Sequence, residues 1–250
     1  MKLVYTNSLA KTLDSLNEAF FFNIHLSKTQ KEEPAKWLIS RRGKAGSYAS
    51  MFAPTELDFS KGAKLFTGEV IRSNAATGHI LGEETCRALI RLGIKTPEVK
   101  DALKRATNGM LKRLYYDICA FDVAGTVRGR SINKGLSYGD KMRKLRGMYC
   151  CGICSVSYWR HLAVGGLDYS EKRLVLGMKD LKSHRDGKGG WHRFPFYYTL
   201  LSLNEINLKP ALDEMRYAVP VLERYLKRAS AKTKISERRW VLAERILTKV

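Results

Sequence analysis

Long hydrophobic runs are absent from this 250-residue sequence. No window approaches the roughly 18 consecutive apolar residues that a membrane-spanning helix needs. The first six residues, 1–6, also lack the apolar core of a signal peptide. We therefore expect a cytoplasmic protein with no membrane span.

Acidic residues are scarce: the chain has 24 Asp and Glu against 45 Lys and Arg, which gives a net charge of +21. Such an excess attracts anions, among them nucleic acid, anionic lipid head groups and diphosphates. The basic residues are spread along the chain, which is also typical of a solvated surface. The charge therefore leaves open a polyanion partner, either nucleic acid or another polyanion.

Cysteines are few and odd in number, which in a chain without a secretion signal predicts free thiols instead of a disulfide framework. The five are Cys86, Cys119, Cys150, Cys151 and Cys154.

The last two cysteines form a Cys-x-x-Cys pair, which suits a soft metal or redox chemistry. A structural zinc site needs four ligands, and a second such pair is missing. His161, His192 or Cys119 would complete a site only through folding. Small cysteines packed between helices are the plainer interpretation. The sequence therefore assigns no metal ligand, and the cofactor is unknown.

Familiar catalytic signatures are absent too. The chain has no Walker loop, dinucleotide fingerprint, zinc finger or His-Glu-x-x-His motif. The alternation typical of strands is nearly absent as well. Whether the protein is an enzyme stays open.

Helical periodicity is what the sequence does contain. In the first segment, for example, Leu9, Leu13, Leu16 and Phe20 follow one face of a helix. We predict a single all-α domain over residues 1–250, with a polar linker at 27–33, a long ordered connection at 44–73 and a basic loop at about 125–147. The predicted helices span residues 8–20, 35–42, 75–92, 97–116, 153–164, 170–183, 195–206, 210–228 and 236–248.

A short internal repeat follows two of the predicted helices. Residues 40–48 resemble residues 183–191, and an aromatic residue closes each copy. Glycines turn the chain sharply there, so that the next helix enters a second layer; repetition of this unit gives a solenoid or concentric layers of helices. The matched pairs are Ser40 with Ser183, Arg42 with Arg185, and Gly46 with Gly189.

Residues 187–191, Gly-Lys-Gly-Gly-Trp, followed by 196–203, resemble one repeat of the protein prenyltransferase β-subunit and squalene cyclase superfamily. The resemblance covers about 35–206 and implies an α/α toroid or partial toroid of repeated helical hairpins, with a central cavity for a small or lipid-like ligand.

The sequence departs from that family at its catalytic motifs. Residues 117–119 have the spacing of the family's Asp-x-Cys zinc pair, but Tyr198 stands where the family's zinc histidine would be. The cyclases' Asp-x-Asp-Asp motif is absent. The resemblance therefore supports the fold more than either activity.

His79 and Glu83 are the candidate catalytic residues, because their spacing places them on one helix face, where they would act as an acid/base pair. Gly78 and Gly82 in the same helix each cost about 1 kcal/mol against Ala, so close packing or a ligand should compensate. The alternative is a buried polar pair with a basic neighbour.

Two further groups are candidate binding residues. Aromatic residues and an arginine after the glycine turn suit an isoprenoid diphosphate or another amphipathic ligand, although they are equally expected as core; they are Trp191, His192, Arg193, Tyr197 and Tyr198. The basic loop would bind phosphates of a polyanion, or would simply be solvated; its candidates are Arg128, Arg130, Lys134, Lys141, Arg143, Lys144 and Arg146.

Two functions follow as hypotheses. The first is a prenyltransferase- or terpene-cyclase-like toroid that binds a small or lipid-like ligand in its central cavity. The alternative is a non-enzymatic basic helical module that binds nucleic acid or another polyanion. A scaffold that holds a protein partner is a third possibility.

Overall fold

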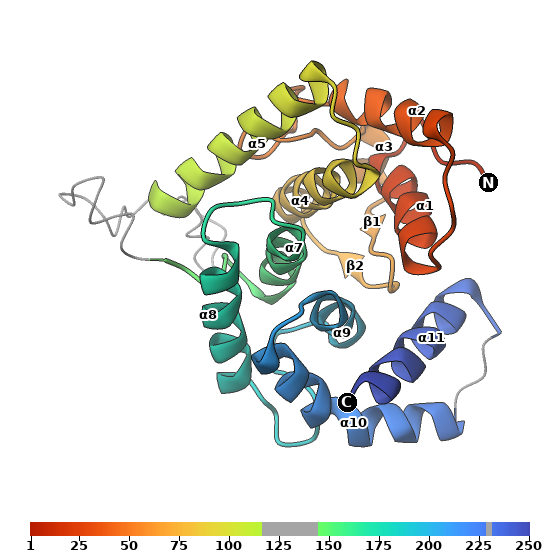
Figure 1. Cartoon of the computed structure of the whole chain (residues 1–250), viewed down its shortest axis with the longest axis vertical. Helices are drawn as coiled ribbons and strands as arrows, with labels where there is room; N and C mark the ends of the chain where they lie inside the picture. The colour runs from red at the N-terminus through yellow and green to blue at the C-terminus, as the bar shows by residue number, and fades with distance from the viewer. Residues whose placement is uncertain (117–144, 229–231) are drawn as a thin grey trace.

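A computed structural model describes residues 1–116, 145–228 and 232–250. These residues are mostly helical, as predicted (Figure 1). None of the described helices is both long and apolar enough to cross a bilayer. The helices are α1 (Leu9–Phe21), α2 (Lys28–Ile39), α3 (Glu56–Ser60), α4 (Asn74–Leu92), α5 (Pro97–Tyr116), α7 (Gly152–Ala163), α8 (Ser170–Ser183), α9 (Phe196–Glu205), α10 (Lys209–Arg228) and α11 (Lys234–Lys249).

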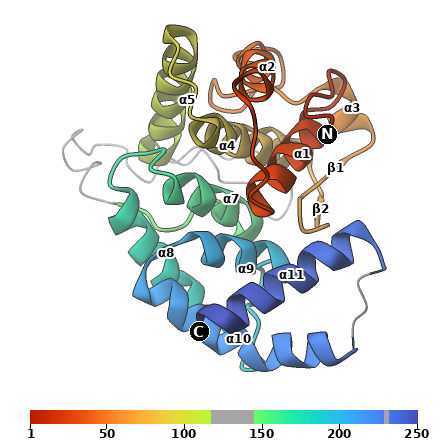
Figure 2. The ribbon, with the colours of Figure 1, turned by 45° about the vertical axis from the view of Figure 1, so that its right-hand side comes forward.

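The helices form two layers (Figures 1 and 2). Going round the inner layer, α1 packs against α4, α4 against α7, α7 against α9, and α9 against α11. The helices α2, α5, α8 and α10 lie outside them. The described helices thus alternate along the sequence between inner and outer positions, apart from the short helix α3.

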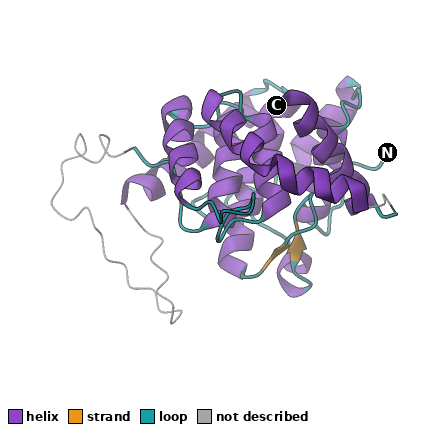
Figure 3. Cartoon of the chain, turned by 90° about the horizontal axis from the view of Figure 1, so that it is seen from below, coloured by secondary structure: helices purple, strands orange, loops and turns teal. Residues whose placement is uncertain are grey.

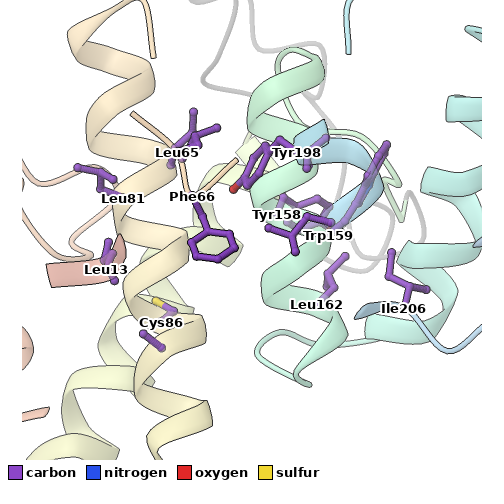
Figure 4. Packing of buried hydrophobic residues seen from close by; sticks show 14 of the residues in the cluster. Leu13, Leu65, Phe66, Leu81, Cys86, Tyr158, Trp159, Leu162, Tyr198 and Ile206 are labelled. Carbon is purple, nitrogen blue, oxygen red and sulfur yellow. The ribbon is translucent and has the colours of Figure 1, made fainter. Parts of the chain in front are cut away.

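Two short strands, β1 (Ala63–Lys64) and β2 (Val70–Ile71), form an antiparallel hairpin at one side of the helices (Figure 3). The loop of this hairpin reaches the inner helices. The ring of Phe66 lies 5.3 Å from that of Phe21 on α1, and its carbonyl accepts a hydrogen bond from Arg238 on α11. Glu69 accepts one from the backbone N–H of Tyr198 on α9. Figure 4 shows Leu65 and Phe66 among the buried side chains. The loop therefore fills space between the inner helices.

Helix ends mostly follow the predicted signals. Ser8 caps α1 by accepting a hydrogen bond from the backbone N–H of Lys11, and Gly93 ends α4 in the left-handed conformation with φ 69°. The predicted bounds of α5 and α8 match the structure. The other long helices differ by one or two residues at an end, except α2, which begins seven residues earlier and ends three residues earlier than predicted. These positions were predictable because caps and glycine stops act locally.

The predicted polar linker at 27–33 is wrong, since this segment is the first half of α2. Ser27 and Gln30 form a capping box that starts the helix there. The absence of apolar residues before Pro34 reflects an exposed helix face instead of a break. The connection at 44–73 contains α3 and the β-hairpin.

The two repeated segments have comparable turns after α2 and α8. An isolated antiparallel bridge joins Arg42 to Phe52 in the first and Arg185 to Trp191 in the second. The matched glycines, Gly46 and Gly189, both have positive φ, 83° and 95°. The first turn closes on Phe52, however, and not on the matched Tyr48.

A buried network of charged groups joins four inner helices. Arg160 on α7 donates to Glu84 on α4 and to Glu205 at the end of α9. Arg87 on α4 also donates to Glu205, and to Asn17 on α1 at 2.7 Å. Tyr198 completes the network through its hydroxyl, which donates to Glu84. The charges are paired within the fold, as buried charges need to be.

We expect the Glu205→Gln variant to lose stability, because the substitution removes a carboxylate that compensates two buried guanidinium groups. Breaking one partner of such a network costs about 3–5 kcal/mol. Urea unfolding followed by helical circular dichroism measures this cost. Asp213→Asn is the matched control, since Asp213 pairs with Lys209 at the surface and an exposed pair contributes less than about 1 kcal/mol. Equal stability of the two variants would contradict the role of the network.

The same carboxylate predicts a pH dependence. Burial raises the pKa of Glu205, but Arg160 and then Arg87 outweigh burial and lower it from 4.5 to about 2. A lowered folded-state pKa means that the ionised carboxylate stabilises the fold above pH 4.5 and that this stabilisation is lost as the pH falls toward 2. The wild-type free energy of unfolding should therefore fall more steeply over this window than that of Glu205→Gln. Parallel pH profiles would exclude the assignment.

Candidate metal centre

His79 lies on the inner helix α4 with its imidazole held between two tyrosine rings. Its ring centroid lies 4.8 Å from that of Tyr48 and 4.2 Å from that of Tyr149. The two tyrosine hydroxyls are hydrogen-bonded to each other at 2.5 Å. The side chain of His79 is 2% exposed. The imidazole is therefore buried in contact with both tyrosine rings, which lie tilted to it.

Two glycines allow the loop that carries Tyr48 to approach α4. A Cβ atom on Gly78 would lie 3.1 Å from the carbonyl oxygen of Gly46, and one on Gly82 would lie 2.8 Å from Cε of Met51. Glycine lowers the stability of a helix interior, so its presence in α4 needs compensation. Close packing of the loop does so, and it places Tyr48 on His79.

Three cysteines lie at the N-terminus of α7, next to His79. One ring nitrogen of His79 and the sulfur atoms of Cys150 and Cys154 all lie within 4.8 Å of one another. Cys151 caps the helix. Hydrogen bonds with Cys150 and Cys154 lower the pKa of the Cys151 thiol, against the opposing effect of burial. Two thiols and one imidazole therefore lie close together, with the third thiol next to them in the chain.

Glu83, one turn along α4 from His79, pairs with His161 of α7. Its Oε2 is hydrogen-bonded to Nδ1 of His161, and its Oε1 lies 3.6 Å from Nε2 of His79. Burial raises the pKa of Glu83, but the charge of His161, its hydrogen bond and the weaker effect of His79 outweigh burial and lower the pKa to about 2. Glu83 is therefore a carboxylate that faces two imidazoles.

Several polar atoms of this cluster have no hydrogen-bond partner among the described residues. They are both ring nitrogens of His79, Oε1 of Glu83 and Nε2 of His161. Buried polar atoms in folded proteins are nearly always satisfied, and an exception calls for an explanation such as an ion or a ligand. His79 is thus buried, positioned and able to bind a further group.

A pocket of about 710 Å³ adjoins the cysteines and includes Cys151 in its wall. Gly152 presses against the backbone of Arg193 and Phe194, where a Cβ atom would overlap the Arg193 carbonyl oxygen. The pocket is lined by Glu69, Val70, Arg72, Ser73, Ala76, Cys151, Ile153, Arg193, Phe194 and Pro195.

The structure brings the predicted pair His79 and Glu83 together, but not the five predicted ligand-binding residues. The indole of Trp191 donates to Glu214, and the ring of Tyr197 packs on Tyr225. Tyr198 belongs to the charged network and His192 is exposed. Arg193 reaches the pocket near the cysteines.

Of the seven predicted polyanion-binding residues, Arg146 alone lies within the described part of the chain. Its backbone carbonyl accepts a hydrogen bond from the hydroxyl of Tyr158. The others lie outside the described residues: Arg128, Arg130, Lys134, Lys141, Arg143 and Lys144.

Family models, curated proteins and solved structures give no match to this chain. The chemistry of the site therefore has to be inferred from its own atoms.

The contact of Gly152 with the loop before α9, at Arg193 and Phe194, predicts an effect on stability. We expect Gly152→Ala to destabilise the protein by about 1–3 kcal/mol, because the added methyl meets backbone that has to shift. Thermal unfolding compares the variant with the wild type. A Gly152→Ala variant as stable as the wild type would show that the loop yields freely.

Proposed function

We propose that this protein is a metal-binding protein that holds a zinc-like ion through His79, Cys150 and Cys154 and presents it to a ligand in the adjoining pocket. The observation that carries the proposal is the meeting of three donor atoms within 4.8 Å, one of them on a buried histidine without a hydrogen-bond partner.

The donor set suits zinc. Zinc prefers tetrahedral sites of thiolate and imidazole ligands, and thiolates select soft ions over calcium or magnesium. Glu83 lies behind His79, where carboxylates commonly orient a metal-binding histidine.

The role of Cys151 distinguishes a structural ion from a catalytic one. As a fourth protein ligand it would close the site, which is typical of structural zinc. As part of the pocket wall, where it lies in the structure, it leaves the fourth position to water or a ligand, which is typical of catalytic zinc. We favour the second arrangement. The bound ion would then act as a Lewis acid or activate water at the pocket.

The arrangement of the helices places this site within the fold. We propose that the alternating layers form a partial α/α toroid of helical hairpins, as the repeated turns and the sequence resemblance suggest. The metal site would lie at the N-terminal ends of the inner helices α4 and α7. The centre is occupied by the charged network and the β-hairpin loop, so the geometry favours a ligand at the rim.

Both functions inferred from the sequence stay predictions. The first is binding of a small or lipid-like ligand in a central cavity, as in prenyltransferases and terpene cyclases. The other is binding of nucleic acid or another polyanion through the basic segment, most of which lies outside the described residues.

Metal analysis tests the proposal directly. We expect protein purified without chelators and supplied with zinc to retain about one ion per chain. His79→Ala and the double variant Cys150→Ser/Cys154→Ser should lose at least tenfold in zinc affinity, because each removes a ligand. Cobalt substitution should give thiolate-to-metal absorption that weakens with each ligand cysteine removed.

Cys86→Ala is the matched control, because Cys86 is a buried thiol of α4 outside the cluster. It should bind zinc like the wild type. Cys151→Ser separates the two uses of the ion, since retained zinc affinity means an open fourth position. Wild-type protein that retains no more zinc than the Cys150→Ser/Cys154→Ser variant would refute the metal centre.

A further inference from the structure

The pocket beside Cys151 has two arginines in its wall. Arg72 precedes α4 and Arg193 precedes α9, and both line the pocket. Both side chains are exposed, and neither guanidinium has a hydrogen bond or ion pair with a described residue. Arginine side chains without an internal partner are available for an anionic group, which the guanidinium binds in a bidentate manner.

The one acidic residue of the pocket is not paired with these arginines. Glu69 uses Oε1 to accept the backbone N–H of Tyr198 and Oε2 to accept the hydroxyl of Thr67. Two arginines against one carboxylate leave the pocket with an excess of positive charge.

Two helices also begin at this pocket. Ser73, the N-cap of α4, and Cys151, the N-cap of α7, both belong to its wall. The positive ends of helix dipoles favour phosphate groups, in addition to the two arginines. Gly152 packs directly on the backbone of Arg193, which has a left-handed φ of 67°, and so positions the Cα from which this arginine extends.

The rest of the pocket is apolar and larger than a single phosphate group needs. Ile153, Phe194 and Pro195 contribute apolar wall, and a volume of about 710 Å³ falls in the range of small-molecule sites. The ligand should therefore have an apolar or planar body attached to its anionic group.

We infer that this pocket binds a small phosphate monoester, with its phosphate between Arg72 and Arg193 and its apolar body against Ile153 and Phe194. The inference rests on the proposed function in one respect: Cys151 joins the pocket to the metal cluster, so that a bound phosphate lies beside the ion. The arginines and the apolar wall belong to the pocket alone.

Calorimetric titration of the zinc-loaded full chain with phenyl phosphate tests this inference. We expect saturable binding, tighter than that of inorganic phosphate because of the apolar wall. The Arg72→Gln/Arg193→Gln variant should lose at least tenfold in affinity, because both anchors are removed. Arg216→Gln, which removes an exposed arginine of α10, should bind as the wild type does.

Several outcomes would overturn the inference: no saturable binding of phenyl phosphate, equal affinity in the Arg72→Gln/Arg193→Gln variant, or tighter binding of benzoate than of phenyl phosphate. The zinc content of the double arginine variant should match the wild type, so that failure of the pocket leaves the metal proposal intact. Conversely, phenyl phosphate binding that survives in zinc-free Cys150→Ser/Cys154→Ser protein supports the pocket even where the metal proposal has failed.

Discussion

The pairing of Arg160 with Glu84 is the contact on which the arrangement of the inner helices depends. It joins α7 to α4 inside the protein, where neither charge is solvated, and Glu205 ties the end of α9 to the same guanidinium. Because an uncompensated buried charge is costly, the pairing favours the register of these helices in which each charge meets its partner. Apolar side chains tolerate changes of packing at similar volume better than buried charges tolerate the loss of a partner. The network therefore acts as the specific element within a core that is otherwise apolar.

The metal cluster depends on that register through neighbouring residues. Glu83 precedes Glu84 on α4, and His161 follows Arg160 on α7, and these two also pair with each other. The two helices thus meet through two adjacent acid–base pairs. His79 lies one turn before Glu83 on α4, and Cys154 lies two turns before His161 on α7. The candidate metal ligands of both helices are therefore on the N-terminal side of the acid–base pairs. A shift of either helix by one residue would break the charged network and would also move these ligands apart.

Much of the fold was predictable from the sequence because its signals are local. Caps such as Ser8 and stops such as Gly93 position helix ends without reference to the rest of the chain. The polar start of α2 was missed because periodicity fails on a helix whose first half is exposed. The β-hairpin loop was missed for another reason: its position is decided by Arg238 and Tyr198, which are far away in sequence.

The candidate site was predictable only in fragments. The helical spacing of His79 and Glu83 was visible, and so was the density of cysteines after residue 149, but no local pattern joins the two segments. More than 70 residues separate His79 from Cys154, and the link between them is the α4–α7 interface. The unusual Gly78 and Gly82 were the one signal that a loop approaches His79 closely, and they identified the helix without identifying the loop. The proposed metal site depends on the charged network, because the same helix register that pairs Glu84 with Arg160 also brings the imidazole of His79 to the thiols of Cys150 and Cys154.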